Sequence, residues 1–235
     1  MTGTQSFRKN VAYRLRRLLI NVWPDNCPLC GRPLHRGETP LCLDCLAQMP
    51  RIRTDQSVFY VGAPGNKVEV HSWFFYNSDD PSHKLIHQIK YNGGRRLARK
   101  LGRELARQKL ERSFDADVIL PVPLHWTKYL KRSYNQSFEI ALGVKDVTGV
   151  KIGKNLYARR AHASQTSRSR QERDENVRGI FGVRRPHELD NKKVVILDDV
   201  ITTGATMLSA LNAILAVSKP ASVVFVSLAH TRHDI

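Results

Sequence analysis

Two adjacent carboxylates stand where an apolar segment meets a turn of small residues. Val194–Leu197 is apolar throughout, Asp198 and Asp199 follow it directly, and the turn Thr202–Thr206 comes next. Backbone N–H groups in such a turn and at the following helix start bind phosphate, and Gly204 lets the backbone approach without a Cβ clash. Carboxylates at a strand end can accept hydrogen bonds from ribose hydroxyls. These residues therefore predict a site for a phosphorylated sugar.

The predicted phosphate ligands are the turn residues Thr202, Thr203, Gly204, Ala205 and Thr206. Three of them are threonines, whose hydroxyls add donors to those of the backbone. The segment has neither the G-x-G-x-x-G of dinucleotide sites nor the G-x-x-x-x-G-K-[ST] of P-loops, which argues against both classes. The alternative is a structural role, in which the aspartates only cap a helix.

The four cysteines form a second chemical pattern. Cys27 and Cys30 make one C-x-x-C pair, Cys42 and Cys45 make another, and eleven residues separate the pairs. Two such pairs can hold Zn²⁺ through four thiolates at about 2.3 Å. A closed four-sulfur site has no open position for a substrate, so its predicted role is to fold a segment too small for its own core. A redox pair or two disulfides remain as alternatives.

The elements that would position these residues alternate between helix and strand. Alternating stretches such as Val58–Val61 predict short strands within residues 51–70. Apolar runs that are too short for helices predict further strands over residues 72–76, 117–123, 193–198 and 222–229. Helical spacing of apolar residues predicts helices over residues 11–22, from Leu85, through 97–105, through 138–144 and over 206–217. Residues 159–178 read as a long polar loop. Helices between continuous apolar strands predict an α/β fold with a parallel sheet flanked by helices.

We expect two domains: residues 1–50, with a basic helix and the cysteine pairs, and residues 51–235, with the sheet. The chain of 235 residues carries 38 Lys and Arg against 21 Asp and Glu, a net charge of +17. A balance this basic favours polyanionic partners such as nucleic acid, although it also fits a protein whose surface is simply basic. No apolar run reaches the roughly 20 residues of a membrane-spanning helix, so the expected location is the cytoplasm, with membrane association only through partners.

The turn and its carboxylates resemble the phosphoribosyl pyrophosphate (PRPP) signature of type I phosphoribosyltransferases. Combined with the cysteine pairs, the whole chain resembles the ComF family, which is associated with DNA uptake in natural transformation. Four further segments carry this resemblance: His87–Gly94, Pro121–His125, Arg132–Gln136, and the stretch 165–181. Ser133 is a visible departure, because the family usually has Gly there.

The resemblance implies roles for individual residues. Asp198 and Asp199 would bind the ribose hydroxyls of PRPP, and Thr202–Thr206 its 5-phosphate. Lys90, Tyr91 and Arg95 would face the pyrophosphate. The resemblance also implies a phosphoribosyltransferase-type fold with an N-terminal four-cysteine zinc ribbon. Mg²⁺ would be held mostly by substrate oxygens and water, as hard cations are on diphosphates.

Two classes of function follow. The favoured one is a PRPP-binding DNA-uptake factor that binds single-stranded DNA through its basic surface and meets helicase or recombination partners. Trp126 and Tyr134, each beside basic residues, qualify as stacking platforms or as core. The other is an active phosphoribosyltransferase, a pentosyltransferase moving phosphoribose to an unknown acceptor. The sequence alone offers no acceptor pocket and leaves catalytic activity open.

Overall fold

The computed structural model describes residues 26–35, 37–52, 59–61, 67–91, 94–110, 114–124, 130, 132–159 and 179–231. The helix expected over residues 11–22, Trp126 and nearly all of the expected polar loop lie outside these ranges. The chain divides into two compact units between Gln48 and Met49. None of the described helices is long and apolar enough to cross a membrane.

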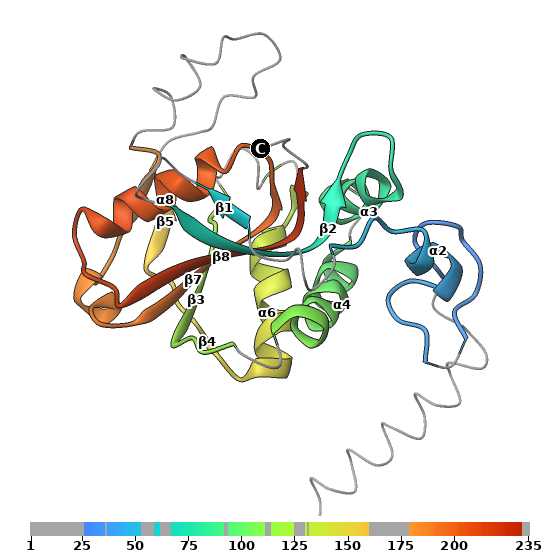
Figure 1. Ribbon diagram of the computed structural model, residues 1–235, viewed down its shortest axis with the longest axis horizontal. Helices are drawn as coiled ribbons and strands as arrows, with labels where there is room; N and C mark the ends of the chain where they lie inside the picture. The colour runs from blue at the N-terminus through green and yellow to red at the C-terminus, as the bar shows by residue number, and fades with distance from the viewer. Residues whose placement is uncertain are drawn as a thin grey trace, which may run out of the picture. The chain divides into compact units, whose positions relative to one another are not determined.

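The second unit is built on a six-stranded sheet in the order β1-β2-β8-β7-β3-β4 (Figure 1). Its strands are β1 (Phe59–Val61), β2 (Val68–Tyr76), β3 (Val118–Pro121), β4 (Lys151–Ile152), β7 (Lys193–Ile201) and β8 (Ser222–Thr231). All neighbours are parallel except β1, which is antiparallel to β2. The predicted parallel sheet is confirmed, with β7 and β8 at its centre.

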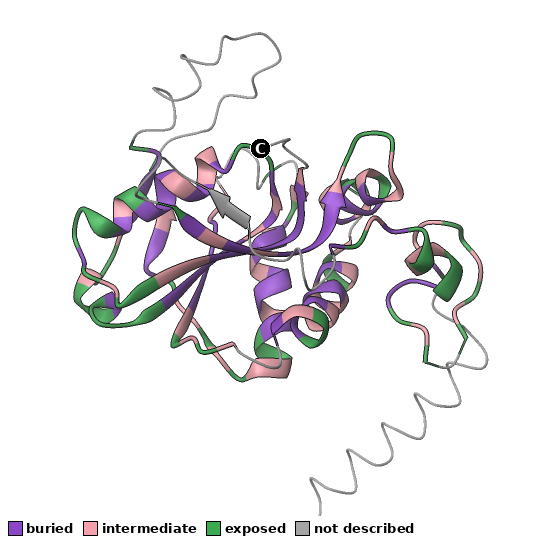
Figure 2. Ribbon diagram, in the orientation of Figure 1, coloured by how far each residue is buried: buried purple, intermediate pink, exposed green. Residues whose placement is uncertain are grey.

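Helices cover both faces of this sheet. Figure 1 shows α8 (Ala205–Leu215) on one side and α4 (Arg95–Leu105) with α6 (Gln136–Thr148) on the other. The remaining helices of this unit are α3 (Pro81–Tyr91), the π-helical turn η2 (Ala106–Leu110) and the 3₁₀ turn η3 (Pro186–Leu189). Because both faces are covered, the central strands are buried along their apolar runs, as Figure 2 shows.

The core on the α8 side joins residues that are far apart in the chain. Val70 of β2, Leu120 of β3, Ile196 of β7 and Phe225 of β8 pack with Ile214 of α8. All five side chains are fully or almost fully buried. This contact holds α8 against β7, and so fixes the direction of the turn that connects them.

Three short strands, β4, β5 and β6, were not predicted. β5 (Leu156–Ala158) and β6 (Phe181–Val183) form a separate antiparallel pair of three residues each. Three residues are too few to show a strand periodicity, and both strands border the polar stretch that we expected to be a loop. The pair matters for function because Ala158 and Phe181 line the cavity described below.

Two glycines bring α4 and α6 into backbone contact. A Cβ built on Gly102 would lie 2.1 Å from the carbonyl oxygen of Ile140, and one on Gly143 would lie 2.2 Å from that of Arg99. The contact is closed on the solvent side by an ion pair of 2.8 Å between Arg99 and Asp146. Larger residues would push the helices apart, so the glycines set where α6 lies relative to its neighbours.

Candidate functional site

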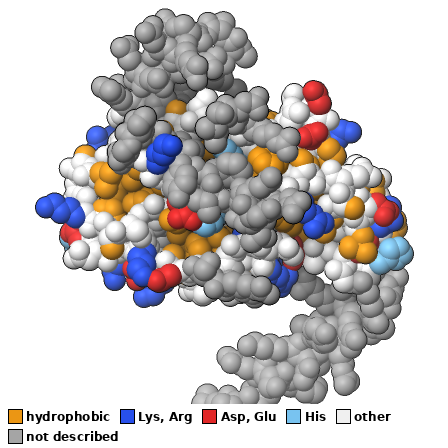
Figure 3. Space-filling view, viewed as in Figure 1, with side chains coloured by type: hydrophobic (Ala, Val, Ile, Leu, Met, Phe, Trp, Pro, Cys, Tyr) orange, Lys and Arg blue, Asp and Glu red, His pale blue; other side chains and the backbone are white. Residues whose placement is uncertain are grey.

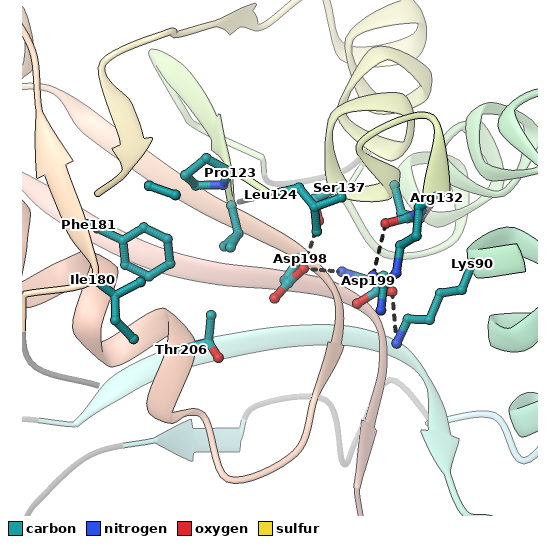
Figure 4. A pocket seen from close by; sticks show the side chains of 13 residues that line it. Lys90, Pro123, Leu124, Arg132, Ser137, Ile180, Phe181, Asp198, Asp199 and Thr206 are labelled. Atoms are coloured by element: carbon teal, nitrogen blue, oxygen red, sulfur yellow. Dashed lines mark hydrogen bonds and ion pairs between the residues drawn. The ribbon is translucent and has the colours of Figure 1, made fainter. Parts of the chain in front are cut away.

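The two aspartates lie on β7, just beyond the point where the neighbouring strand β3 ends. β3 ends at Pro121, which pairs with Leu197 of β7. β7 continues past that point through Asp198 and Asp199, held on its other side by β8. A cavity of about 190 Å³ opens at this carboxyl edge (Figure 4). Ligands of open α/β sheets bind at such edges.

The cavity has a polar half and an apolar half. The polar half is lined by Lys90, Arg132, Gln136, Ser137, Asp198, Asp199 and Thr206. The apolar half is lined by Val122, Pro123, Leu124, Ala158, Ile180 and Phe181. In Figure 4 the two aspartates lie between Lys90 and Arg132 on one side and Ile180, Phe181 and Thr206 on the other. The cavity could therefore hold a molecule with a charged end and an apolar end.

Asp198 is held from the N-terminus of α6. Its Oδ1 atom accepts a hydrogen bond of 2.7 Å from the Ser137 hydroxyl and one of 2.9 Å from the Asp199 N–H. Burial, and then the neighbouring charge of Asp199, raise the pKa of Asp198 to about 7, against the opposing effects of Ser137 and Lys90. The carboxyl group therefore gains or loses its proton near neutral pH. A cation that binds beside it would favour the loss of that proton.

Asp199 forms the ion pair of the site. Asp199 is only 7% exposed, and its Oδ2 atom lies 3.1 Å from the Lys90 ammonium. Oδ1 accepts a hydrogen bond from the Val200 N–H at 2.8 Å. Among the described groups, Oδ2 receives no hydrogen bond of good geometry, so its contact with Lys90 is chiefly electrostatic. A buried carboxylate held this way can still accept hydrogen bonds from a ligand.

The segment before α6 anchors the polar half of the cavity. Asn135 is the N-cap of α6: it accepts a hydrogen bond from the Phe138 N–H and donates one to the Val122 carbonyl. Tyr134 is buried and its hydroxyl donates to the Ile89 carbonyl. These contacts tie the start of α6 to the ends of β3 and α3, so Gln136 and Ser137 face the cavity.

Ser133 adopts the left-handed conformation, with φ of 63°. Gly takes this conformation without a Cβ penalty, whereas an L-residue other than Gly is strained by about 1–2 kcal/mol. The departure noted in the sequence therefore changes the side chain but keeps a backbone that Gly would favour.

The predicted phosphate turn leads directly into α8. Gly204 is the helix N-cap with φ of 75°, and Ala205 begins the helix, one residue before the expected start. Thr206 lines the cavity, whereas Thr202 and Thr203 are exposed in the adjoining turn. The turn thus leads into a helix N-terminus, and the Thr206 hydroxyl lies in the cavity that the two aspartates line.

The three residues predicted to face the pyrophosphate do not share one environment. Lys90 points into the cavity. Tyr91 is 55% exposed, and the Arg132 guanidinium lies over its ring at 5.6 Å. Arg95 forms an ion pair of 2.7 Å with Glu139 and does not line the cavity. Of the three, Lys90 lies beside the carboxylates. Arg132, which was not among the predicted pyrophosphate ligands, lines the same cavity.

Sequence reasoning missed the contribution of Ser137. The motif Arg132–Gln136 was noted without roles for its side chains, and Ser137 follows it directly. The available signal was its place in the first turn of a helix after a strand that ends at the same edge as β7. The apolar residues Ile180 and Phe181 were likewise noted in a motif but not placed at the site.

The four cysteine sulfurs of the first unit converge. All four Sγ atoms lie within 4.8 Å of one another, and those of Cys30 and Cys42 are 3.7 Å apart. Tetrahedral zinc with Zn–S bonds of about 2.3 Å requires neighbouring sulfurs about 3.8 Å apart. The donor set therefore fits a tetrahedral metal, and no disulfide joins these cysteines.

Local contacts hold the cysteine pairs in place. Gly31 turns the chain after the first pair with φ of 77°, and Cys42 caps the short helix α2 (Leu43–Ala47). Glu38 accepts backbone hydrogen bonds from Leu43 and His35, which lower its pKa. Burial opposes ionisation of Cys27, yet N–H groups around it lower its pKa to about 6. Burial, and then hydrogen bonds to the other three cysteines, raise the pKa of Cys45 instead.

The parallel sheet with its flanking helices has a phosphoribosyltransferase-type fold. Residues 138–235 match the phosphoribosyl transferase domain family. That match contains β7, the turn, α8 and all of α6 except its first two residues. Of the residues that line the polar half of the cavity, Asp198, Asp199 and Thr206 lie within it.

Three relatives are similar to this chain over most of its length. The chain is 24% identical over 212 residues to Competence protein F of Haemophilus influenzae, covering 80% of this chain and 90% of that protein. It is 27% identical over 187 residues to DNA utilization protein YhgH of Escherichia coli K12, covering 77% and 74%. It is 24% identical over 216 residues to Competence protein ComFC of Bacillus subtilis, covering 92% and 82%. With the domain match, these relatives support the resemblance to the ComF family that the motifs predicted.

Among solved structures, the chain resembles an allosteric regulatory enzyme of purine biosynthesis with a TM-score of 0.41 and 19% identity. The similarity covers 60% of this chain and 30% of that one, so the chain spans less than a third of the enzyme. A likeness at this level carries no functional argument.

Proposed function

We propose that the chain binds Mg²⁺-complexed PRPP at the carboxyl edge of β7 and acts in DNA uptake. The observation that carries the ligand is the pair Asp198 and Asp199 beside a turn that opens a helix, with Lys90 facing them. Asp198 and Asp199 would accept hydrogen bonds from the ribose hydroxyls. Thr202–Thr206 would bind the 5-phosphate through N–H groups and hydroxyls.

The pyrophosphate would lie toward the other side of the aspartates. Lys90 supplies one positive charge there and Arg132 a second, which can contact a diphosphate through two N–H groups at once. Arg95 and Tyr91 remain candidates that a bound diphosphate would have to draw inward. Mg²⁺ would be held mostly by diphosphate oxygens and water, and Asp198 and Asp199 are the carboxylates of the site that could also hold it.

The cellular role rests on the relatives. Two of them are named as competence proteins and one as a DNA utilization protein. The net charge of +17 supports a polyanionic partner, and we propose that this partner is single-stranded DNA. Zn²⁺ on the four cysteines would have a structural role, since four thiolates leave no open position.

Calorimetric titration of Mg²⁺ and PRPP into the zinc-loaded protein tests the ligand. We expect binding in the micromolar range that is lost in an Asp198→Ala/Asp199→Ala variant. The chain offers a matched control in Asp79 and Asp80, its other adjacent aspartate pair, whose replacement by Ala should leave the affinity unchanged. A folded wild-type protein that binds no PRPP would refute the proposed ligand.

A second candidate, an active transferase, draws support from the apolar half of the cavity. Phe181, Leu124 and Val122 could pack against a planar acceptor beside the ribose. Release of pyrophosphate from PRPP when a nucleobase or another acceptor is added would support it. The assay should include Phe181→Ala, which would reduce turnover if this wall holds the acceptor.

A further inference from the structure

Four aromatic rings form a row along α3 and the end of β2. His83, His87 and Tyr91 are spaced by four residues on one face of the helix, and Tyr76 ends the neighbouring strand. Successive ring centroids from Tyr76 to Tyr91 lie 6.0, 6.4 and 4.7 Å apart. We call these four residues the ring row.

The ring row is not part of the core. α3 buries its other face through Ser82, Leu85, Ile86 and Ile89. His87 and Tyr91 are exposed, and His83 and Tyr76 are half-buried. Aromatic side chains are ordinarily drawn into a core, so a solvent-facing series of rings at helical spacing is a feature that packing does not explain.

Positive charge accompanies the rings. The Arg132 guanidinium lies 5.6 Å from the centre of the Tyr91 ring, and Lys84 is exposed on the turn between His83 and His87. The sequence of α3 contains no Asp or Glu, and Asp79 and Asp80 directly precede the helix. Most of the row therefore offers flat apolar rings next to cations.

The described Lys and Arg side chains do not gather into a patch on the face shown in Figure 3, where they are scattered among acidic and hydrophobic ones. Tyr134, one of the two aromatic residues that the sequence suggested for stacking, is 4% exposed and donates a hydrogen bond to a backbone carbonyl. Its ring is unavailable, so it belongs to the core.

We propose that the ring row is a binding site for single-stranded nucleic acid, with bases stacked on His83, His87 and Tyr91. Base stacking on aromatic rings is sequence-tolerant, and cations beside the rings hold the phosphates. Single strands expose the faces of their bases, whereas a duplex hides them between neighbouring pairs, so single strands are the expected ligand. This inference rests on the proposed DNA-binding function and assigns it to a surface.

The row also leads to the cavity. Arg132 lies over the last ring of the row and lines the polar half of the cavity. A strand on the rings would therefore end beside the proposed diphosphate site, and one guanidinium would serve both ligands.

Fluorescence anisotropy with a labelled oligothymidylate of about 30 nucleotides tests the ring row. We expect a His83→Ala/His87→Ala/Tyr91→Ala variant to bind at least about tenfold more weakly than the wild type, since stacking contributes substantially per base. Replacing the exposed His187, which lies in η3, by Ala is the matched control and should leave affinity unchanged.

Two single substitutions separate stacking from charge. Tyr91→Phe keeps a ring and should retain affinity, whereas Tyr91→Leu should weaken binding without altering the dependence on salt. Lys84→Ala should instead reduce the slope of log affinity against log salt by about one, because one phosphate contact is lost. An oligonucleotide with abasic sites should bind the wild type about as weakly as the triple variant binds the intact strand.

The outcomes distinguish this inference from the proposed function. If the wild type binds the strand and the folded triple variant binds equally well, the ring row is refuted while DNA binding elsewhere stands. If the wild type binds no single-stranded DNA, both proposals fail. The Asp198→Ala/Asp199→Ala variant should keep its DNA affinity, which would separate the ring row from PRPP binding.

Discussion

The cysteine cluster and the aspartate site are built in opposite ways. The cluster takes its four sulfurs from Cys27–Cys45, a single short stretch of chain. The aspartate site takes Lys90 from α3, Ser137 from α6 and its carboxylates from β7, with the first and last more than a hundred residues apart. The cluster is therefore assembled locally, whereas the aspartate site needs the whole sheet and the helices around it.

This difference separates two kinds of stability. A structural zinc contributes about 10–16 kcal/mol to segments that fold around it. The aspartate site makes the opposite contribution, because it holds two adjacent carboxylates, one with a pKa raised by burial and by the other. Variants that damage one region and spare the other would show how independent the two are.

The largest effect is expected from Cys42→Ser. It removes one of four ligands, so bound zinc should fall from about one equivalent to near zero and residues 26–48 should lose their structure. Metal analysis and limited proteolysis would detect both changes. PRPP affinity should stay within about twofold of the wild type, because the site lies wholly in the second unit. A large loss of PRPP affinity in this variant would show that the two regions are coupled.

Gly143→Ala should break the aspartate site without touching the cavity. The added methyl would meet the Arg99 carbonyl at 2.2 Å, so α4 and α6 must separate. We expect a loss of about 3 kcal/mol in the free energy of unfolding, measured by urea denaturation, and weaker PRPP binding. Lys145→Ala, an exposed position on the same helix, is the control and should change little. Unchanged stability would mean that the helices can move apart freely.

Asp198→Asn should stabilise the fold, and more at high pH. The pKa of Asp198 is about 7 in the folded protein against 3.8 as its ordinary value, so the folded state holds its proton more firmly. Between these values a rise in pH favours unfolding, and Asn removes that effect. The gain over wild type should be larger at pH 8 than at pH 5 by about 2 kcal/mol.

Asp146→Asn is a control of opposite sign. The hydrogen bond from Arg99, helped by Arg103, lowers the pKa of Asp146 to about 2. Its contribution is therefore present above the ordinary value of 3.8 and is lost as the pH falls through 2. The substitution should cost up to about 1 kcal/mol at pH 7 and nothing near pH 2. Parallel pH profiles for the two variants would contradict the assignment.

The smallest effect is expected from Ser133→Gly. Ser133 occupies the left-handed region, so Gly should relieve strain and stabilise the fold by about 0.5–1 kcal/mol, partly offset by its greater freedom when unfolded. Thermal denaturation would measure the gain. Ser133→Ala keeps the Cβ and should show no gain. A destabilised Gly variant would mean that the serine hydroxyl contributes more than the strain costs.

The sequence predicted what is local. The cysteine spacing predicted all four members of a cluster that converges, and the apolar runs predicted the parallel strands β3, β7 and β8 with small differences at their ends. It missed β4, β5 and β6, because strands this short carry no usable period. The strand pair and the cavity wall at Phe181 depend on contacts across long chain separations.

The site partners were harder to predict for the same reason. Nothing in the local sequence of Lys90 distinguishes it from Arg95, yet one faces Asp199 and the other faces Glu139. Ser137 became visible only once Asn135 was seen to cap α6 against the end of β3. Their roles as ligands remain predictions that the titrations above address.

The ion pair between Lys90 and Asp199 also sets a condition on which molecules can enter. The ammonium and the carboxylate are paired with each other before a ligand binds. A ligand that separates them must therefore interact favourably with both groups. Free pyrophosphate would pair with Lys90 and leave the buried Asp199 carboxylate without its cation. Ribose 5-phosphate would hydrogen-bond to the carboxylate and leave the Lys90 ammonium without an anion. Only a ligand that brings an anion and hydroxyls together, or an anion with its metal, replaces the pair without loss. Fragments of PRPP would thus bind far more weakly than their share of its contacts suggests.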